Sequence, residues 1–291
     1  MSETSDTGQG TTIHVIGASG RSGAALCRAL LADGMQVVPV VRNAARWAAT
    51  GLPATPRIAD LSSPVALGRA LTDASRIVSC AHARHVPAIL AAAPAAARLV
   101  FLGSTRKFSR WPDAHGDGVR AGEAAFLAAG RPGVMLHPTM IYGAQGEDNV
   151  QRLAALLRRL PVVPLPDGGR MKVQPIHQAD VTRAIQAALT VPWTGPETLV
   201  IAGPQPVSYA DFVRAIAAAY HLSAPRIVPV PAALLRLAAW PTRFIPGLPT
   251  IRPDEVRRLL EDKDFDIGPM QEVLGIQPMA LTQGLASLVR G

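Results

Sequence analysis

The stretch Thr12–Gly23, TIHVIGASGRSG, decides the fold, because a β-branched apolar run leads into closely spaced glycines and then an alanine-rich segment. This order predicts a strand, a glycine turn and a helix. Gly17 allows a tight turn, Gly20 lets the backbone approach a pyrophosphate, and Gly23 lets the helix lie against the strand. The helix start adds backbone N–H groups and a partial positive charge, so we expect a dinucleotide here. The residues predicted to bind it are Gly17, Ser19, Gly20, Arg21, Ser22 and Gly23.

The second apolar run, Met35–Val41, ends in Arg42 and Asn43. An acidic residue about 20 positions after the glycines normally holds the ribose 2′-hydroxyl of NAD. Arg42 takes that place, and its guanidinium suits a 2′-phosphate because it can make paired, charge-assisted hydrogen bonds. We therefore expect NADP(H) as the cofactor, with Arg21 approaching the same phosphate. The alternative is that both arginines are solvated surface residues.

The 291 residues, with 48% hydrophobic content, predict a cofactor domain with an attached subdomain. Residues 1–11 are polar and predict a mobile tail, not a signal peptide. We expect no membrane span, because no sufficiently long apolar run is present. Cys27 and Cys80 have no metal-like spacing and are interpreted as reduced, buried thiols of a cytoplasmic protein, without a metal site.

The net charge of +8 raises the question of nucleic-acid binding. The basic residues are scattered and aromatic residues make up only 4% of the chain, so we expect no nucleic-acid partner. An anionic ligand accounts for part of the excess charge. The segment 231–248 is apolar, basic and contains tryptophan, which is typical of contact with a membrane surface. The favoured interpretation of this segment is a helix packed on the subdomain.

Strands and helices alternate along the chain, with further strands predicted at Thr55–Ala59, Ile77–Ala81, Leu99–Leu102 and Val134–His137. This alternation predicts an α/β protein with a Rossmann-type, doubly wound parallel sheet, whose ligands gather at the carboxyl ends of the strands. Asp60 is placed to meet the adenine amino group or to cap the helix Pro64–Leu71. The strand ends add these cofactor-binding candidates: Arg42, Asn43, Asp60, Leu61, Ala81, His82, Ser104, His137, Pro138 and Met140.

Five segments together resemble the extended and atypical branch of the short-chain dehydrogenase/reductase superfamily, which is epimerase/dehydratase-like. They are GASGRSG at 17–23, FLGST at 101–105, HPTMIYG at 137–143, QPIHQADV at 174–181 and LGIQPMALTQGL at 274–285. The resemblance implies a dinucleotide-binding domain over 12–143 and 171–203, and a substrate subdomain over 144–170 and 204–291. The best-known members of this branch act on nucleotide sugars.

The resemblance also implies that a tyrosine, with a lysine four residues later, exchanges a proton with the substrate, while a serine or threonine polarises the same oxygen. Thr105 matches the serine or threonine place; the alternative is a hydroxyl that only bonds backbone. If Glu123 is the glutamate that usually follows the lysine, Val119 occupies the lysine place and His115 the tyrosine place. The tyrosines at positions 142, 209 and 220 have no lysine four residues later, so the usual pair is absent.

Three side chains are candidates for the missing acid. His115 titrates near neutral pH, and Lys107 follows Thr105 by two residues. The alternative for both is a solvated loop over 108–118. Tyr142 is the third candidate, although the resemblance implies that its segment mainly shapes the nicotinamide pocket. His177 is a substrate-binding candidate or a structural histidine, and Asp180 is expected at the start of a helix.

These observations leave two functional hypotheses. The first is an NADP(H)-dependent oxidoreductase or epimerase acting on a nucleotide sugar or a similar polar carbonyl compound. The second is a non-catalytic NADP(H)-binding scaffold or regulator. The place matched by Thr105 and the large subdomain favour the enzyme, whereas the absence of the tyrosine and lysine pair opposes it.

Overall fold

The computed structural model describes residues 12–143, 149–239, 257 and 259–290. The chain forms two compact units. The first unit comprises Met1–Gly103, Gly118–Leu136 and Ile185–Thr198, and the second comprises Ser104–Asp117, His137–Ala184 and Leu199–Gly291. The division into domains expected from the sequence stays a prediction.

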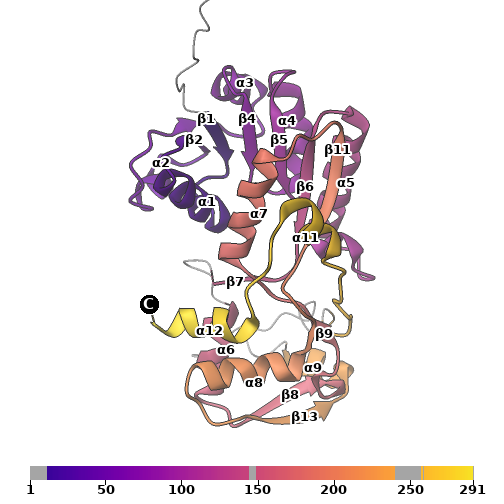
Figure 1. The fold of residues 1–291 in the computed structure, drawn as a ribbon. Coiled ribbons are helices and arrows are strands. Elements are labelled where there is room, and N and C mark those ends of the chain that lie inside the picture. The colour runs from indigo at the N-terminus through magenta and orange to yellow at the C-terminus, as the bar shows by residue number, and fades with distance from the viewer. Residues whose placement is uncertain (1–11, 144–148, 240–256, 258, 291) are drawn as a thin grey trace, which may run out of the picture. The chain divides into compact units, whose positions relative to one another are not determined.

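A seven-stranded sheet has the order β11-β6-β5-β4-β1-β2-β3 (Figure 1). Strand β1 pairs in parallel with its neighbours β2 and β4. The pairs β2–β3, β4–β5 and β5–β6 are parallel as well. The predicted Rossmann-type parallel sheet is therefore confirmed. Its strands are β1 (Thr12–Ile16), β2 (Gln36–Val41), β3 (Arg57–Ile58), β4 (Arg76–Ser79), β5 (Arg98–Leu102), β6 (Gly133–Pro138) and β11 (Pro196–Ile201).

The helices between these strands begin where the sequence offers caps. Asn43 and Ser63 accept hydrogen bonds from backbone N–H groups in the first turns of α2 and α3, and a proline follows Ser63 at the helix start. Ser63 therefore caps α3, and the alternative role of Asp60 as that cap is wrong. The helices are α1 (Arg21–Ala32), α2 (Ala44–Ala48), α3 (Pro64–Leu71), α4 (Val86–Ala92), α5 (Ala114–Ala129) and α7 (Gln178–Thr190), with the 3₁₀ turns η1 (Ala83–His85) and η2 (Thr105–Phe108).

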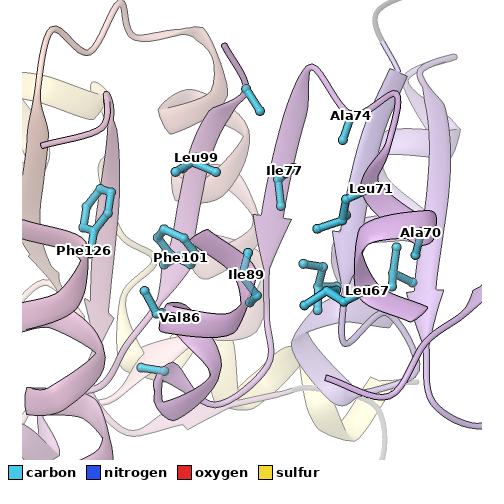
Figure 2. Packing of buried hydrophobic residues seen from close by; sticks show 14 of the residues in the cluster. Leu67, Ala70, Leu71, Ala74, Ile77, Val86, Ile89, Leu99, Phe101 and Phe126 are labelled. Atoms are coloured by element: carbon cyan, nitrogen blue, oxygen red, sulfur yellow. The ribbon is translucent and has the colours of Figure 1, made fainter. Parts of the chain in front are cut away.

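Buried apolar side chains of α3, α4 and α5 pack on β4 and β5 (Figure 2). Leu67 and Leu71 come from α3, and Phe126 of α5 meets Phe101 of β5 edge to face at 5.1 Å between ring centres. Full burial of each such side chain contributes about 1.5–3 kcal/mol, so this layer stabilises the strands whose ends carry the predicted site. Of the two free thiols, Cys27 is buried as expected, whereas Cys80 is only partly buried.

His14 is a fully buried histidine in the middle of β1. Its Nε2 atom lies 3.3 Å from a carboxylate oxygen of Asp73, which also pairs with Arg57. Burial, together with the charge of Arg57, outweighs Asp73 and lowers the pKa of His14 below its ordinary value. The neutral imidazole is thus the form that the folded chain favours.

Replacing His14 by leucine is expected to make the free energy of unfolding less dependent on pH between about 6.5 and 5.5. The unfolded chain binds a proton there that folded His14 resists, so this histidine costs stability as pH falls below its unfolded pKa, by at most about 1.4 kcal/mol per pH unit. Denaturant unfolding at several pH values measures the slope. An identical slope in wild type and variant would contradict the assignment.

The second unit has its own core, made by α6, α8 and α12 with short two-stranded sheets. Phe212, Val213 and Ile216 of α8 are buried in it, with Leu285 of α12. The pairs are β7 with β10, β9 with β12 and β8 with β13. The strands are β7 (Ile141–Tyr142), β8 (Val162–Pro166), β9 (Lys172–Val173), β10 (Ile176–His177), β12 (Val207–Ser208) and β13 (Arg226–Val230). The helices are α6 (Asn149–Leu157), α8 (Tyr209–Ala219), α9 (Ala232–Ala239), α11 (Gly268–Leu274) and α12 (Leu281–Arg290), with the turn η3 (Asp167–Gly169).

The segment 231–248 is described only in part. Its first residues form α9, and residues 240–248 lie outside the described residues. Within the described ranges, every helix is too short or too polar to cross a bilayer. The favoured helix packed on the subdomain and the alternative of contact with a membrane surface both stay predictions.

Candidate functional site

The glycine turn of the first unit has the geometry that its sequence predicts. Gly17 has a φ of +75°, and a Cβ there would lie 2.9 Å from the backbone nitrogen of Ala81. A Cβ on Gly23 would lie 2.3 Å from the Gly17 carbonyl oxygen, so the first turn of α1 rests directly on the loop. Gly20 begins α1 without a capping side chain, and the first turn contains no acidic residue. This helix start is therefore suited to an anionic group.

Arg42 and Asp60 lie at the ends of neighbouring strands. Val41 is opposite Ile58 in the parallel register, so both residues leave the sheet at one edge. Both are exposed. The hydrogen bonds that Ser62 donates to the carboxylate lower the pKa of Asp60, and the charge of Arg42 lowers it further.

The other predicted residues of this edge have local roles as well. Asn43 accepts a hydrogen bond from the Arg46 backbone N–H, and His82 accepts one through Nδ1 from Arg84. Leu61 and Ala81 pack against the apolar core. Ser19 is partly buried, while Gly20 and Arg21 are exposed. These residues of the first unit follow the carboxyl ends of β1, β2, β3 and β4, and their role in cofactor binding stays a prediction.

In the second unit, Ser104 and Thr105 follow β5, and His137 and Pro138 end β6. The buried imidazole of His137 accepts a hydrogen bond from the Ser104 backbone N–H through Nδ1, at 3.2 Å. The Thr105 hydroxyl donates to the Pro138 carbonyl at 3.2 Å, which matches the alternative of a hydroxyl bonded to backbone. Ser104 accepts from the Arg106 backbone N–H, which leaves its own hydroxyl proton available as a donor. Met140 packs on the core of this unit.

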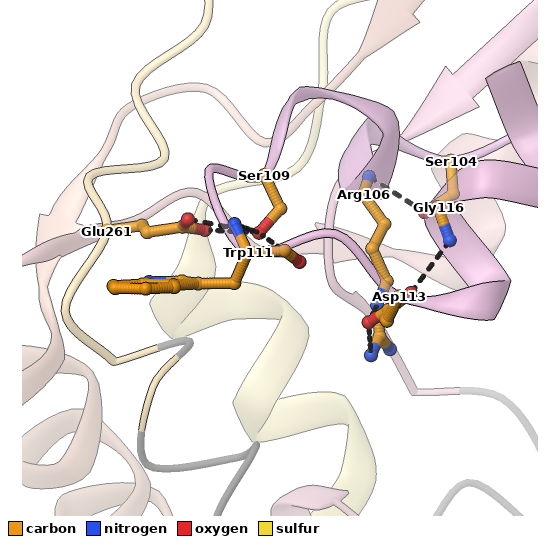
Figure 3. A network of polar contacts seen from close by, with 7 residues as sticks. All are labelled: Ser104, Arg106, Ser109, Trp111, Asp113, Gly116 and Glu261. Atoms are coloured by element: carbon orange, nitrogen blue, oxygen red, sulfur yellow. Dashed lines mark hydrogen bonds and ion pairs between the residues drawn. The ribbon is translucent and has the colours of Figure 1, made fainter.

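A polar network holds the loop that follows Thr105 (Figure 3). Arg106 pairs with Asp113, which also accepts a hydrogen bond from the Gly116 N–H at the start of α5. The carboxylate of Glu261 accepts a hydrogen bond from the Ser109 hydroxyl (Figure 3). It accepts another from the Arg110 N–H. Glu261 is only 7% exposed, although it comes from a segment about 150 positions away. Sequence reasoning missed Glu261, since no local pattern marks such a distant anchor.

The proposed proton donors are not equivalent. Lys107 has its ammonium 4.7 Å from the centre of the Phe108 ring, and His115 is exposed on the first turn of α5. Tyr142 is 1% exposed, and burial raises the pKa of its phenol well above the ordinary value. The Tyr142 hydroxyl packs closely against Gly284, because a Cβ added to that glycine would lie only 2.1 Å from the hydroxyl oxygen. A buried, weakly acidic phenol is the poorest of these donors near neutral pH.

His177 is the last residue of β10 and contacts Tyr142, with ring centres 5.2 Å apart. Its Nδ1 accepts a hydrogen bond from the Ala179 N–H, so in the neutral ring Nε2 carries the proton. Burial lowers the pKa of His177, although Asp180 opposes the shift. Asp180 lies in the first turn of α7, as expected, and accepts from Arg183 and from the Met279 N–H.

Comparison with known families adds a decisive observation. Residues 17–129 match a family model described as NAD(P)H-binding. This part of the chain is therefore similar to an NAD(P)H-binding family. The matched residues include the glycine turn, Arg42 and the ends of β2, β3 and β4 described above. No curated protein matches the chain in sequence.

Several solved structures resemble this chain over nearly its whole length. An NADPH-dependent quinone oxidoreductase of Escherichia coli complexed with NADPH has a TM-score of 0.74 and 18% identity, over 95% of this chain and 99% of that one. UDP-glucuronic acid 4-epimerase of Bacillus cereus, with UDP-glucuronic acid and NAD, has a TM-score of 0.72 and 16% identity, over 96% and 99%. A short-chain dehydrogenase/reductase superfamily protein of Agrobacterium tumefaciens with bound NAD has a TM-score of 0.70 and 15% identity, over 96% of each. At these identities the likeness shows the fold, so the Rossmann-type α/β fold expected from the sequence is confirmed.

Proposed function

We propose that the protein is an NADP(H)-dependent oxidoreductase or epimerase that acts on a nucleotide sugar or a similar polar carbonyl compound. Arg42 is the residue that favours NADP(H) over NAD(H) in this proposal, because its guanidinium follows the end of β2, where an NAD-binding domain has an acidic residue. The known proteins of this fold include one described with NADPH and others described with UDP-sugars and NAD. Their reactions define the substrate classes worth testing.

The residues after β5 supply the chemistry in this proposal. Ser104 has a hydroxyl proton to donate to a substrate oxygen, whereas Thr105 uses its proton on Pro138 and would accept. Lys107 and His115 are the candidate proton donors, and Tyr142 has the least support because its phenol is buried. His177 is proposed to contact the substrate through Nε2. NADP(H), when bound, supplies or accepts the hydride.

One observation favours the alternative of a non-catalytic NADP(H)-binding scaffold. If Glu123 is the glutamate that usually follows the lysine, the lysine place falls at Val119, which is 1% exposed and belongs to the apolar core of the first unit. A core residue at this place takes no part in proton transfer. A scaffold of this kind would bind NADP(H) and turn over no substrate.

Exchanging Arg42 for aspartate tests the choice of cofactor. We expect NADP⁺ affinity to fall roughly 100-fold, since a charge-assisted pair is replaced by repulsion, while NAD⁺ affinity changes by less than about threefold. Calorimetry with both nucleotides on the purified protein measures this. Equal losses for NADP⁺ and NAD⁺, or no loss, would refute the role of Arg42.

A turnover assay distinguishes the hypothesis of an enzyme from that of a non-catalytic scaffold. Purified protein with NADPH is mixed with UDP-sugars, keto compounds and quinones, and absorbance and products are followed. Turnover that falls in Ser104→Ala and in Thr105→Val supports the enzyme. Tight NADPH binding without turnover of any compound in the panel supports the scaffold.

A further inference from the structure

Three charged or titratable side chains lie together at one edge of the first unit. Arg42 follows β2, Asp60 follows β3, and His85 ends the turn η1 after β4. All three residues follow strands of the parallel sheet at the carboxyl ends of those strands, and the charges of Arg42 and Asp60 act on His85. His85 is partly buried, while Arg42 and Asp60 are exposed. Nothing in the sequence pattern marks His85 as part of a site.

Helix packing brings His85 to this edge. α3 and α4 lie side by side, and Leu61, just before α3, packs in the same apolar core as Ala83 of η1. Both helices return along the same face of the parallel sheet, so their first residues lie at the same edge as the strand ends (Figure 2). His85 immediately precedes α4 and therefore lies at the same edge as Asp60, which precedes α3.

Two glycines of α5 fix the position of η1. A Cβ on Gly118 would lie 2.7 Å from the imidazole carbon Cε1 of His82. A Cβ on Gly122 would lie 2.1 Å from the Ala83 carbonyl oxygen. The backbone of η1 at Ala83 thus packs against α5 at Gly122 at a distance that only glycine permits, which fixes the turn that carries His85.

We propose that His85 is a proton-dependent contact for the 2′-phosphate of NADP(H), acting beside Arg42. This inference rests on the proposed function. A 2′-phosphate carries a charge near −1.5 to −2 at neutral pH, which one guanidinium does not neutralise. The carboxylate of Asp60 further reduces the positive potential around Arg42. An imidazolium at His85 supplies the second positive charge and a second N–H donor.

The charges around His85 make this contact conditional on a proton. Burial, followed by the charge of Arg84, lowers the pKa of His85, and Arg42 acts in the same direction while Asp60 opposes it. The histidine is therefore neutral in the nucleotide-free chain near pH 7. An arriving phosphate favours the charged ring and raises its pKa, so NADP(H) binding takes up a proton. Affinity for NADP⁺ consequently gains from His85 as pH falls from 8 to 6, whereas affinity for NAD⁺ does not.

Calorimetry of the purified chain with NADP⁺ and NAD⁺ at pH 6, 7 and 8, in two buffers of different ionisation enthalpy, tests the proposal. We expect His85→Gln to bind NADP⁺ about tenfold more weakly than wild type at pH 6 and within about twofold at pH 8. The variant should also take up less proton with NADP⁺ at pH 7. The 2′-phosphate itself titrates near pH 6 in both proteins, so the difference between them isolates the histidine.

Two further variants complete the test. His85→Lys keeps a fixed positive charge and should bind NADP⁺ tightly at pH 8 without the additional proton uptake. His221→Asn is the matched control, since His221 is exposed, belongs to the second unit and has a φ of +54° that asparagine tolerates. It should retain the wild-type pH dependence.

The failures of the two proposals are distinguishable. If His85→Gln and wild type have the same pH dependence and proton uptake while Arg42→Asp still weakens NADP⁺ binding, the role of His85 is overturned and NADP(H) binding stands. If wild type binds NAD⁺ better than NADP⁺, or binds neither, the assignments of Arg42 and His85 both fall.

Discussion

Replacing Gly23 by alanine is expected to abolish nucleotide binding and to destabilise the first unit. The added methyl carbon would lie 2.3 Å from the Gly17 carbonyl oxygen and 2.8 Å from the Ala18 Cα atom. These are backbone atoms of the turn and have no rotamer with which to avoid the methyl group. The start of α1 must therefore move away from the loop, which separates the N–H groups of the helix from the turn that positions a pyrophosphate.

We expect Gly23→Ala to lower the free energy of unfolding by roughly 1–3 kcal/mol or more, as overpacking does, and to weaken binding of NADP⁺ and NAD⁺ alike by over about 100-fold. Denaturant unfolding and calorimetry measure the two effects. Gly68→Ala is the matched control, because Gly68 lies inside α3 with open space around it. That exchange should stabilise the protein by about 0.5–1 kcal/mol. Nucleotide binding by Gly23→Ala at wild-type strength would contradict the role of this glycine.

Arg131→Ala is expected to cost about 2–4 kcal/mol of stability, because one guanidinium donates hydrogen bonds to a group of mostly part-buried backbone carbonyls. The side chain donates to Leu90, Ala93 and Pro94, the last at 2.5 Å. It also reaches the carbonyl oxygens of Ala95 and Ala97. These acceptors lie in and after the last turn of α4, where helical carbonyls have no partner within the helix.

Thermal and denaturant unfolding test this expectation. Lysine at the same position should recover only part of the loss, because an ammonium cannot spread its donors in a planar fork. Arg98→Ala, on an exposed side chain at the start of β5, is the control and should change stability by less than about 0.5 kcal/mol. A loss of that small size in Arg131→Ala would show that water replaces the guanidinium at these carbonyls.

The sheet was predictable because its information is local. Apolar runs of β-branched residues, separated by helical segments and ended by glycine or polar residues, mark β1, β2, β4, β5 and β6 within one or two residues. Ser63 before Pro64 marks the start of α3, whereas the expected role of Asp60 as that cap, given as one of two alternatives, is wrong. A serine immediately before the proline was the better signal, because the N-cap directly precedes the first helical residue.

The site was predictable only where one short segment builds it. Gly17 and Gly23 act on each other within a few residues, so their spacing is informative. His85 reaches the neighbourhood of Arg42 only through the packing of α3 against α4, and no spacing rule encodes that packing. The same holds for Glu261, whose partners are about 150 positions earlier.

The late position of Glu261 in the sequence has a consequence for the nascent chain during translation. Ser109 and Arg110 are synthesised about 150 residues before Glu261, so the carboxylate that binds them is absent while the stretch between them is translated. During that interval the loop after Thr105 has only its local contacts, such as the pairing of Arg106 with Asp113. We expect a nascent chain stalled before residue 261 to be cleaved in this loop by a protease faster than a chain that includes Glu261.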